Sequence, residues 1–238
     1  MEYSNYEVLD GSKSTAELSR SFFANVYKFM FIALAVSGLV SWYSAYSGWY
    51  FDLVVNSEGG MNPMGYVLMF APLILVIALQ ARINKMSYSM ALFMFLAYAV
   101  LLGISLSFIF LVYTSGSIAL TFFVTAGAFG SMALLGYFTK TDLSKMGSLL
   151  YMLFIGMFIA GLANILMGSE MISYVISFMG LFVFTGLTAW EMQRLKSIAS
   201  EPSLQGENRK KAELIGGLTL YILFINLFMS ILRFVGDR

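Results

Sequence analysis

The sequence predicts an all-α integral membrane protein, folded as a bundle of seven transmembrane helices. Hydrophobic residues make up 59% of the 238 residues and charged residues only 11%, whereas a soluble domain carries about 25% charged residues. The charges also lie between long uncharged runs, each close to the roughly 20 apolar residues with which a helix crosses the hydrocarbon core of a bilayer. The formal net charge of +1 argues against a nucleic-acid partner.

Seven spans follow from the uncharged runs taken in order. The run at residues 86–139 contains 54 residues, which is long enough for two spans joined by a tight turn at residues 114–117. The other five runs are long enough for one span each and cover residues 29–51, 59–81, 146–169, 171–190 and 214–232. Between the last two spans, residues 197–213 are expected to form a mobile polar connection, because charges there surround Pro202 and Gly206. The alternative assignment has six spans and one re-entrant segment.

The basic residues predict the orientation of the chain. Twelve of the fourteen Lys and Arg residues fall on one side of the membrane if seven spans alternate, and basic residues concentrate on the cytoplasmic side. We therefore expect a polar cytoplasmic N-terminal tail over residues 1–24, one membrane domain over residues 25–236, and an external C-terminus. In the six-span alternative the C-terminus would be cytoplasmic.

The absence of two residue types removes several classes of function. The sequence contains neither Cys nor His, so it cannot form disulfides, thiolate nucleophiles, serine-type triads with His, histidine proton relays or most zinc sites. The spans also lack a lysine for a retinal Schiff base, apart from Lys28 at the rim of the first span. We therefore expect a protein that is not an enzyme and that binds no cofactor.

Small residues recur four positions apart in the middle spans. Ala126 and Gly130, like Gly127 and Ser131, form such pairs in the fourth span. Small residues at this spacing allow helix backbones to approach closely in a membrane. We expect this face of the fourth span to pack against another helix.

The last span carries polar residues on one helical face. A face that points into lipid would leave polar atoms without hydrogen bonds, so this face is expected to point into the bundle. Asn226 is a hydrogen-bonding group on this face, and interhelical hydrogen bonding is its alternative, purely structural role. Arg233 lies near the outer end, where a snorkelling membrane anchor is the common explanation. The face consists of Thr219, Leu223, Asn226, Ser230 and Arg233.

Glu191 is the candidate functional acid. It directly follows the uncharged run at residues 171–190, and a continuing helix places Arg194 one turn beyond it. An ionisable group at this depth requires a partner or a water-filled cavity. It is interpreted either as a structural ion pair with Arg194 or as a titratable gate on a water-accessible path.

Four segments resemble the Bax inhibitor family, also known by its transmembrane Bax inhibitor motif, and in particular its bacterial-type members. The similarity covers most of the chain, and the combination of the last two segments is specific to that family. The segments are Gly103–Phe110, Thr125–Gly147, Phe184–Lys196 and Leu220–Arg233.

The resemblance implies a seven-helix bundle with the last helix at its centre, and a pH-sensitive calcium leak. It also implies a pair of acids, one on each of the last two helices, that closes the path and titrates. Glu191 falls at the first of these positions, which is usually Asp, and Leu223 replaces the second acid. Arg233 matches a family arginine near the outer end. In bacteria, modulation of a membrane-bound AAA protease is a second role attributed to the family.

The leading hypothesis is a passive cation leak in the bacterial inner membrane, surrounded by lipid and carrying Ca²⁺ or another cation. Glu191 is expected to be the acid of the path and a weak Ca²⁺ ligand, because Ca²⁺ usually takes 6–8 oxygen ligands. Without an acid at position 223, two carboxyl groups cannot titrate as a coupled pair, and the pH dependence of the leak should be weak. The alternative is a non-conducting protein that binds and modulates a membrane protease.

Overall fold

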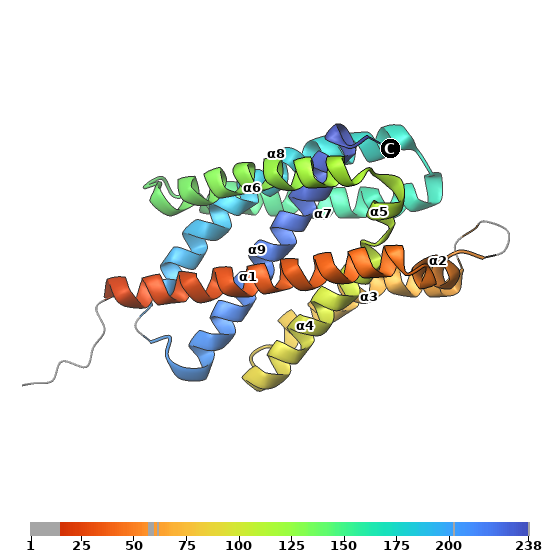
Figure 1. Cartoon of the computed structure of the whole chain (residues 1–238). Coiled ribbons are helices and arrows are strands. Elements are labelled where there is room, and N and C mark those ends of the chain that lie inside the picture. The colour runs from red at the N-terminus through yellow and green to blue at the C-terminus, as the bar shows by residue number, and fades with distance from the viewer. Residues whose placement is uncertain (1–14, 57–59, 61, 202, 238) are drawn as a thin grey trace, which may run out of the picture.

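The computed structural model describes residues 15–56, 60, 62–201 and 203–237, and these residues form nine α-helices (Figure 1). Seven are long and apolar enough to cross a membrane, if the short α5 is counted with α4. The predicted bundle of seven long apolar helices is therefore confirmed. The helices are α1 (Thr15–Tyr46), α2 (Trp49–Val54), α3 (Pro63–Arg82), α4 (Tyr88–Ser105), α5 (Phe108–Val112), α6 (Ser115–Phe138), α7 (Ser144–Met167), α8 (Glu170–Ala199) and α9 (Gly206–Val235).

The long uncharged run at residues 86–139 does contain two spans, but their junction differs from the predicted turn. The first span breaks after Ser105 and continues as the short helix α5. Thr114 then caps α6, because its side-chain oxygen accepts a hydrogen bond from the backbone N–H of Ser117 at 3.3 Å. Residues 115–117, expected in the turn, are therefore the first turn of α6.

Helix α9 lies at the centre of the bundle (Figure 1). It contacts α1, α4, α6 and α8. Within its most apolar stretch 67% of the residues are buried, against 11–33% in the other six spans. Helices α3 and α7 lie at the periphery, where most of their side chains face the surroundings. The last helix is thus the core around which the other helices pack.

The connection between the last two spans is shorter and more ordered than the sequence suggests. We expected a mobile polar segment over residues 197–213, but α8 continues to Ala199 and α9 begins at Gly206. The first turns of α9 contact two other helices. The backbone N–H of Tyr88 donates to Glu207 Oε1 at 2.7 Å, and Arg209 Nη2 donates to the carbonyl oxygen of Leu18. These charges hold helix ends together, which is why the segment is helical.

We refer to this end of the bundle as the basic end; here α1, α4, α7 and α9 begin and α3, α6 and α8 end. Residues 1–14 of the expected tail lie outside the described part of the chain. Residues 15–24 form the first turns of α1, in which Phe22 is completely buried.

The glycines of α6 face in different directions. A Cβ on Gly127 or Gly130 would meet nothing within 4 Å, so the predicted packing face of this span contacts no other part of the described chain. The close approach occurs instead at Gly136, where a Cβ would lie 2.0 Å from the carbonyl oxygen of Ala189 on α8. The expectation for Gly127 and Gly130 is therefore wrong, because four-residue spacing identifies a smooth face without identifying its neighbour.

Substitution of Gly136 and Gly130 by Ala should distinguish a position packed against α8 from an open one. Gly136→Ala places a methyl group inside the α6–α8 contact, so we expect it to destabilise the protein by about 1–3 kcal/mol, as overpacked cores do. Gly130→Ala is the matched control, because its added methyl group meets open space. Thermal unfolding of the purified protein in detergent measures both. Equal melting temperatures for the two variants would contradict the close packing of α6 on α8.

Candidate functional site

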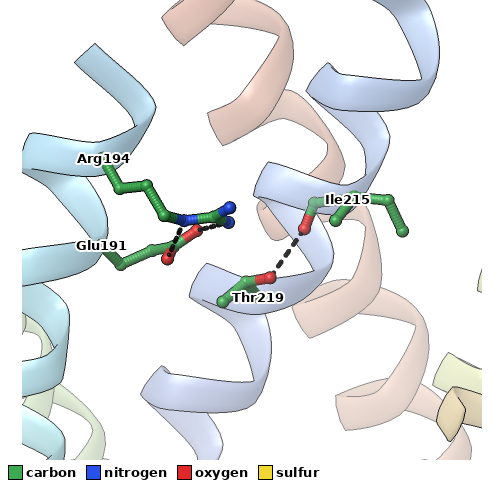
Figure 2. A network of polar contacts seen from close by, with 4 residues as sticks. All are labelled: Glu191, Arg194, Ile215 and Thr219. Carbon is green, nitrogen blue, oxygen red and sulfur yellow. Dashed lines mark hydrogen bonds and ion pairs between the residues drawn. The ribbon is translucent and has the colours of Figure 1, made fainter. Parts of the chain in front are cut away.

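Glu191 and Arg194 form a buried ion pair on α8 (Figure 2). Arg194 Nε donates to Glu191 Oε2 at 2.8 Å, and Arg194 Nη2 donates to Glu191 Oε1 at 2.6 Å. The Glu191 side chain is only 1% exposed, whereas that of Arg194 is 40% exposed. Two parallel hydrogen bonds make this the strongest type of carboxylate–guanidinium contact. The arginine thus neutralises the acid and connects it to the polar surroundings.

The pair points from α8 towards the turn of α9 that contains Ile215 and Thr219 (Figure 2). Thr219 does not contact the pair through a hydrogen bond that the structure records; its Oγ1 donates to the carbonyl oxygen of Ile215 at 2.9 Å. On the other side, the guanidinium carbon of Arg194 lies 5.8 Å from the centre of the Trp190 ring, which stacks edge-on with Tyr151. Aromatic rings therefore cover the basic partner while α9 covers the acid.

Two polar side chains on the polar face of α9, Asn226 and Ser230, donate hydrogen bonds within their own helix. Asn226 Nδ2 donates to the carbonyl oxygen of Ile222 at 2.8 Å, and Ser230 Oγ donates to that of Asn226 at 2.8 Å. Leu223 and Ser230 on this face are buried, as expected for a face that points into the bundle. The hydrogen bonds of Asn226 and Ser230 do not connect helices, because their side chains reach the carbonyl groups one turn back.

A cavity of about 310 Å³ lies beside the outer half of this face. Its polar lining comes from Ser177, Asn226, Ser230 and Arg233. The remaining lining is apolar and includes Phe184 of α8. Two of the predicted site residues, Asn226 and Arg233, therefore share one cavity at the end of the bundle opposite to the basic end.

The predicted site residues thus fall into two groups separated by an apolar layer. On α8, Glu191 follows Phe184 by seven residues, which is roughly 10 Å along a helix. Between these levels lie Leu187 of α8 and Leu223 of α9, both buried. The buried Thr188 lies there too, but its hydroxyl donates to the carbonyl oxygen of Phe184 at 2.7 Å. The structure places Glu191 and Arg194 together and Asn226 and Arg233 together, with Leu223 in the layer between them. Neither the ion pair nor the residues of this layer belong to the lining of the cavity.

Glu213 is a buried acid that the sequence did not reveal. It is 5% exposed, and its Oε2 accepts a hydrogen bond from Asn25 Nδ2 of α1 at 3.0 Å. Arg209 Nε lies 3.3 Å from Glu213 Oε1. The sequence interpretation assigned Glu213 to a solvated connection because charges surround it. The spacing of Arg209 and Glu213 by four residues, typical of an ion pair along a helix, was the available signal.

The described residues offer limited ligands for a divalent cation. No group of three or more acidic side chains converges anywhere among them. Both oxygens of Glu191 are engaged by Arg194 in this conformation, so a cation could use this carboxylate only after the guanidinium moves away. A single carboxylate supplies two of the 6–8 oxygens that Ca²⁺ usually takes.

Fold and site together define a seven-helix membrane protein with a neutralised acid beside its central helix. The sequence model of the family described as "Inhibitor of apoptosis-promoting Bax1" matches residues 19–238. The chain therefore belongs to the Bax inhibitor-1 family.

Bacterial proteins of similar length match almost the whole chain. Inner membrane protein YbhL of Escherichia coli is 41% identical over 220 residues, which are 92% of each chain. An uncharacterized protein of Borreliella burgdorferi is 36% identical over 230 residues, or 97% of each chain, and one of Rickettsia prowazekii is 36% identical over 227 residues, or 95% of this chain and 94% of its own. Like its relative in Escherichia coli, the chain is a multi-pass protein of the inner membrane.

Because Glu191 is more buried than Arg194, removing the charge of Arg194 should destabilise the protein more than removing the charge of Glu191. Arg194→Gln leaves a buried carboxylate without its cation, so we expect this substitution to destabilise the protein by about 1–3 kcal/mol. The loss is smaller than the ~3–5 kcal/mol expected when a fully buried pair is broken, because Arg194 is half exposed. Glu191→Gln should be milder, because Arg194 can turn towards water. The double variant should be more stable than Arg194→Gln alone. Thermal unfolding checks the order, and a milder effect of Arg194→Gln than of Glu191→Gln would contradict it.

Proposed function

We propose that this inner-membrane protein conducts Ca²⁺ or another cation passively, with Glu191 as the acid of the path. The observation that carries the proposal is the position of Glu191. A carboxylate 1% exposed inside a membrane protein is expensive and marks a functional site by default. The polar cavity beside Asn226 and Arg233 supplies an entrance on the opposite side of the apolar layer.

In this proposal, the structure corresponds to the closed state of the path. Arg194 occupies both oxygens of Glu191, and Leu223 belongs to the apolar layer that separates the pair from the cavity. Opening requires that the guanidinium leaves the carboxylate and that the layer around Leu223 hydrates. The half-exposed position of Arg194 makes the first step feasible, because its charged end already reaches towards the surroundings.

The first test is Ca²⁺ entry into proteoliposomes between pH 5 and pH 8. Glu191→Gln should lower the flux several-fold at every pH, because the path loses its negative charge while the side chain keeps its size. Glu201→Gln is the matched control, since Glu201 is an exposed acid in the α8–α9 connection. Wild-type flux equal to that of empty vesicles at every pH would overturn the proposal.

The second test concerns the residue at position 223. The wild-type flux should depend weakly on pH, because a single carboxyl group lacks the second acid with which it would share a proton. Leu223→Asp puts an acid one helical turn from Thr219 on the face of α9 that points into the bundle, and it should make the flux change steeply with pH. An unchanged pH profile in this variant would contradict the role given to position 223.

The alternative function is a non-conducting protein that binds and modulates a membrane AAA protease. The buried Leu223 supports it, because an apolar side chain stands at the position of a second acid and the cavity beside Asn226 and Arg233 does not include Glu191 in its lining. Co-purification of the full chain and of a variant without residues 1–21 tests this alternative. Capture of a membrane protease by the full chain but not by the shortened chain would support it, and the absence of any protease in both samples would reject it.

A further inference from the structure

A groove of about 580 Å³ lies between α1, α6 and α8 at the basic end of the bundle. Its walls are apolar and aromatic, and two of its residues face outward: Leu134 is 61% exposed and Phe138 is 70% exposed. In a spanning helix such exposed apolar side chains face lipid. The groove is therefore open to the bilayer. Its apolar and aromatic lining consists mainly of Phe23, Tyr27, Ala133, Leu134, Phe138 and Met192.

Two cations lie at the rim of this groove. Arg20 of α1 lines it, is exposed, and forms no ion pair with any other described residue. Lys196 of α8 lies next to the lining: its Nζ donates to the carbonyl oxygen of Tyr137 at 2.7 Å and lies 4.8 Å from the centre of the Tyr137 ring. Tyr137 lines the groove. The acid nearest to Arg20 in sequence, Glu17, does not belong to the lining.

An apolar groove that is open to lipid and has cations at the membrane surface matches an anionic phospholipid. We propose that this groove binds one such lipid, with an acyl chain along Ala133 and Leu134 and the phosphate between Arg20 and Lys196. Basic pockets between transmembrane helices on the cytoplasmic side recognise anionic headgroups. The groove need not enclose the whole lipid, because it is open to the bilayer and the rest of the acyl chains can stay in the hydrocarbon.

The site goes beyond the proposed cation path and does not depend on it. Met192 lines the groove and follows Glu191 directly in the sequence. The hydroxyl group of Tyr27 on α1 lies 3.6 Å from the sulfur of Met192. A lipid in the groove therefore contacts the same turn of α8 that carries the ion pair, and it fills the space where α1, α6 and α8 diverge.

Lys145 provides the matched control. It is exposed in the first turn of α7 at the basic end, and it does not line the groove. Lys145→Gln and Arg20→Gln both remove one positive charge from the basic end. If anionic lipids respond only to the general positive charge of this end, the two substitutions will have equal effects.

The experiment is native mass spectrometry of the full chain with added phosphatidylglycerol or phosphatidylcholine of identical acyl chains. We expect one phosphatidylglycerol to be retained in preference to phosphatidylcholine. Arg20→Gln should reduce this preference about five-fold, the ratio that corresponds to the ~1 kcal/mol contributed by one basic residue near the membrane surface. Lys196→Gln should act in the same direction, and Lys145→Gln should leave the preference unchanged. Equal melting temperatures show that Arg20→Gln, at an exposed position, is folded.

Three outcomes would overturn the proposal. The first is equal retention of the two lipids by the wild type, which means that the groove does not select a headgroup. The second is an equal loss in Arg20→Gln and Lys145→Gln, which means that the preference comes from diffuse charge. The third is displacement of the lipid by glycerol phosphate at equal concentration, which means that the apolar groove contributes nothing to binding.

Discussion

The hydrocarbon core offers no hydrogen bonds, so a polar group inside it is costly unless it finds a partner within the protein. This constraint shapes the bundle at several levels. Asn226, Thr219 and Ser230 donate to carbonyl groups of their own helix, so α9 can carry them into the core without needing a particular neighbour. Glu191 cannot be satisfied in this way, because a carboxylate only accepts hydrogen bonds. Glu191 is instead paired with Arg194 on the same helix, and this pairing allows α8 to bury an acid beside α9.

The number of helices could be predicted from the sequence because bilayer thickness fixes helix length, and uncharged runs show where that length is available. The ends of the helices were less predictable. Charges at residues 207–213 suggested a solvated connection, yet they form helical turns that contact α1 and α4 through Arg209 and Glu207. The predicted packing face at Gly127 and Gly130 of α6 was wrong for another reason. The sequence shows that a helix face is made of small residues, but whether another helix packs on it depends on the arrangement of the neighbours. Gly136 is in contact with α8 and Gly130 is not.

The candidate site was predictable in its parts and not in its arrangement. Glu191 stands out because it ends an uncharged run, and its pairing with Arg194 follows from helical spacing. The apolar layer at Leu223 could not be foreseen, since it depends on how far α8 and α9 are displaced along each other. Glu213 was missed because its partner Asn25 lies 188 residues away in the sequence. Local patterns identify groups that are costly to bury, and tertiary packing decides which partner satisfies them.

The position of the core helix at the end of the chain has a consequence for biosynthesis. Ribosomes add about 5–20 residues per second, so the 30 residues of α9 emerge over a few seconds after the other spans are already in the bilayer. During this interval α1, α4, α6 and α8 lack their common neighbour, and lipid or a chaperone has to occupy its place. A nascent chain that stops before Gly206 contains six spans and no core. A chain released before Gly206 therefore lacks the one helix that α1, α4, α6 and α8 all contact.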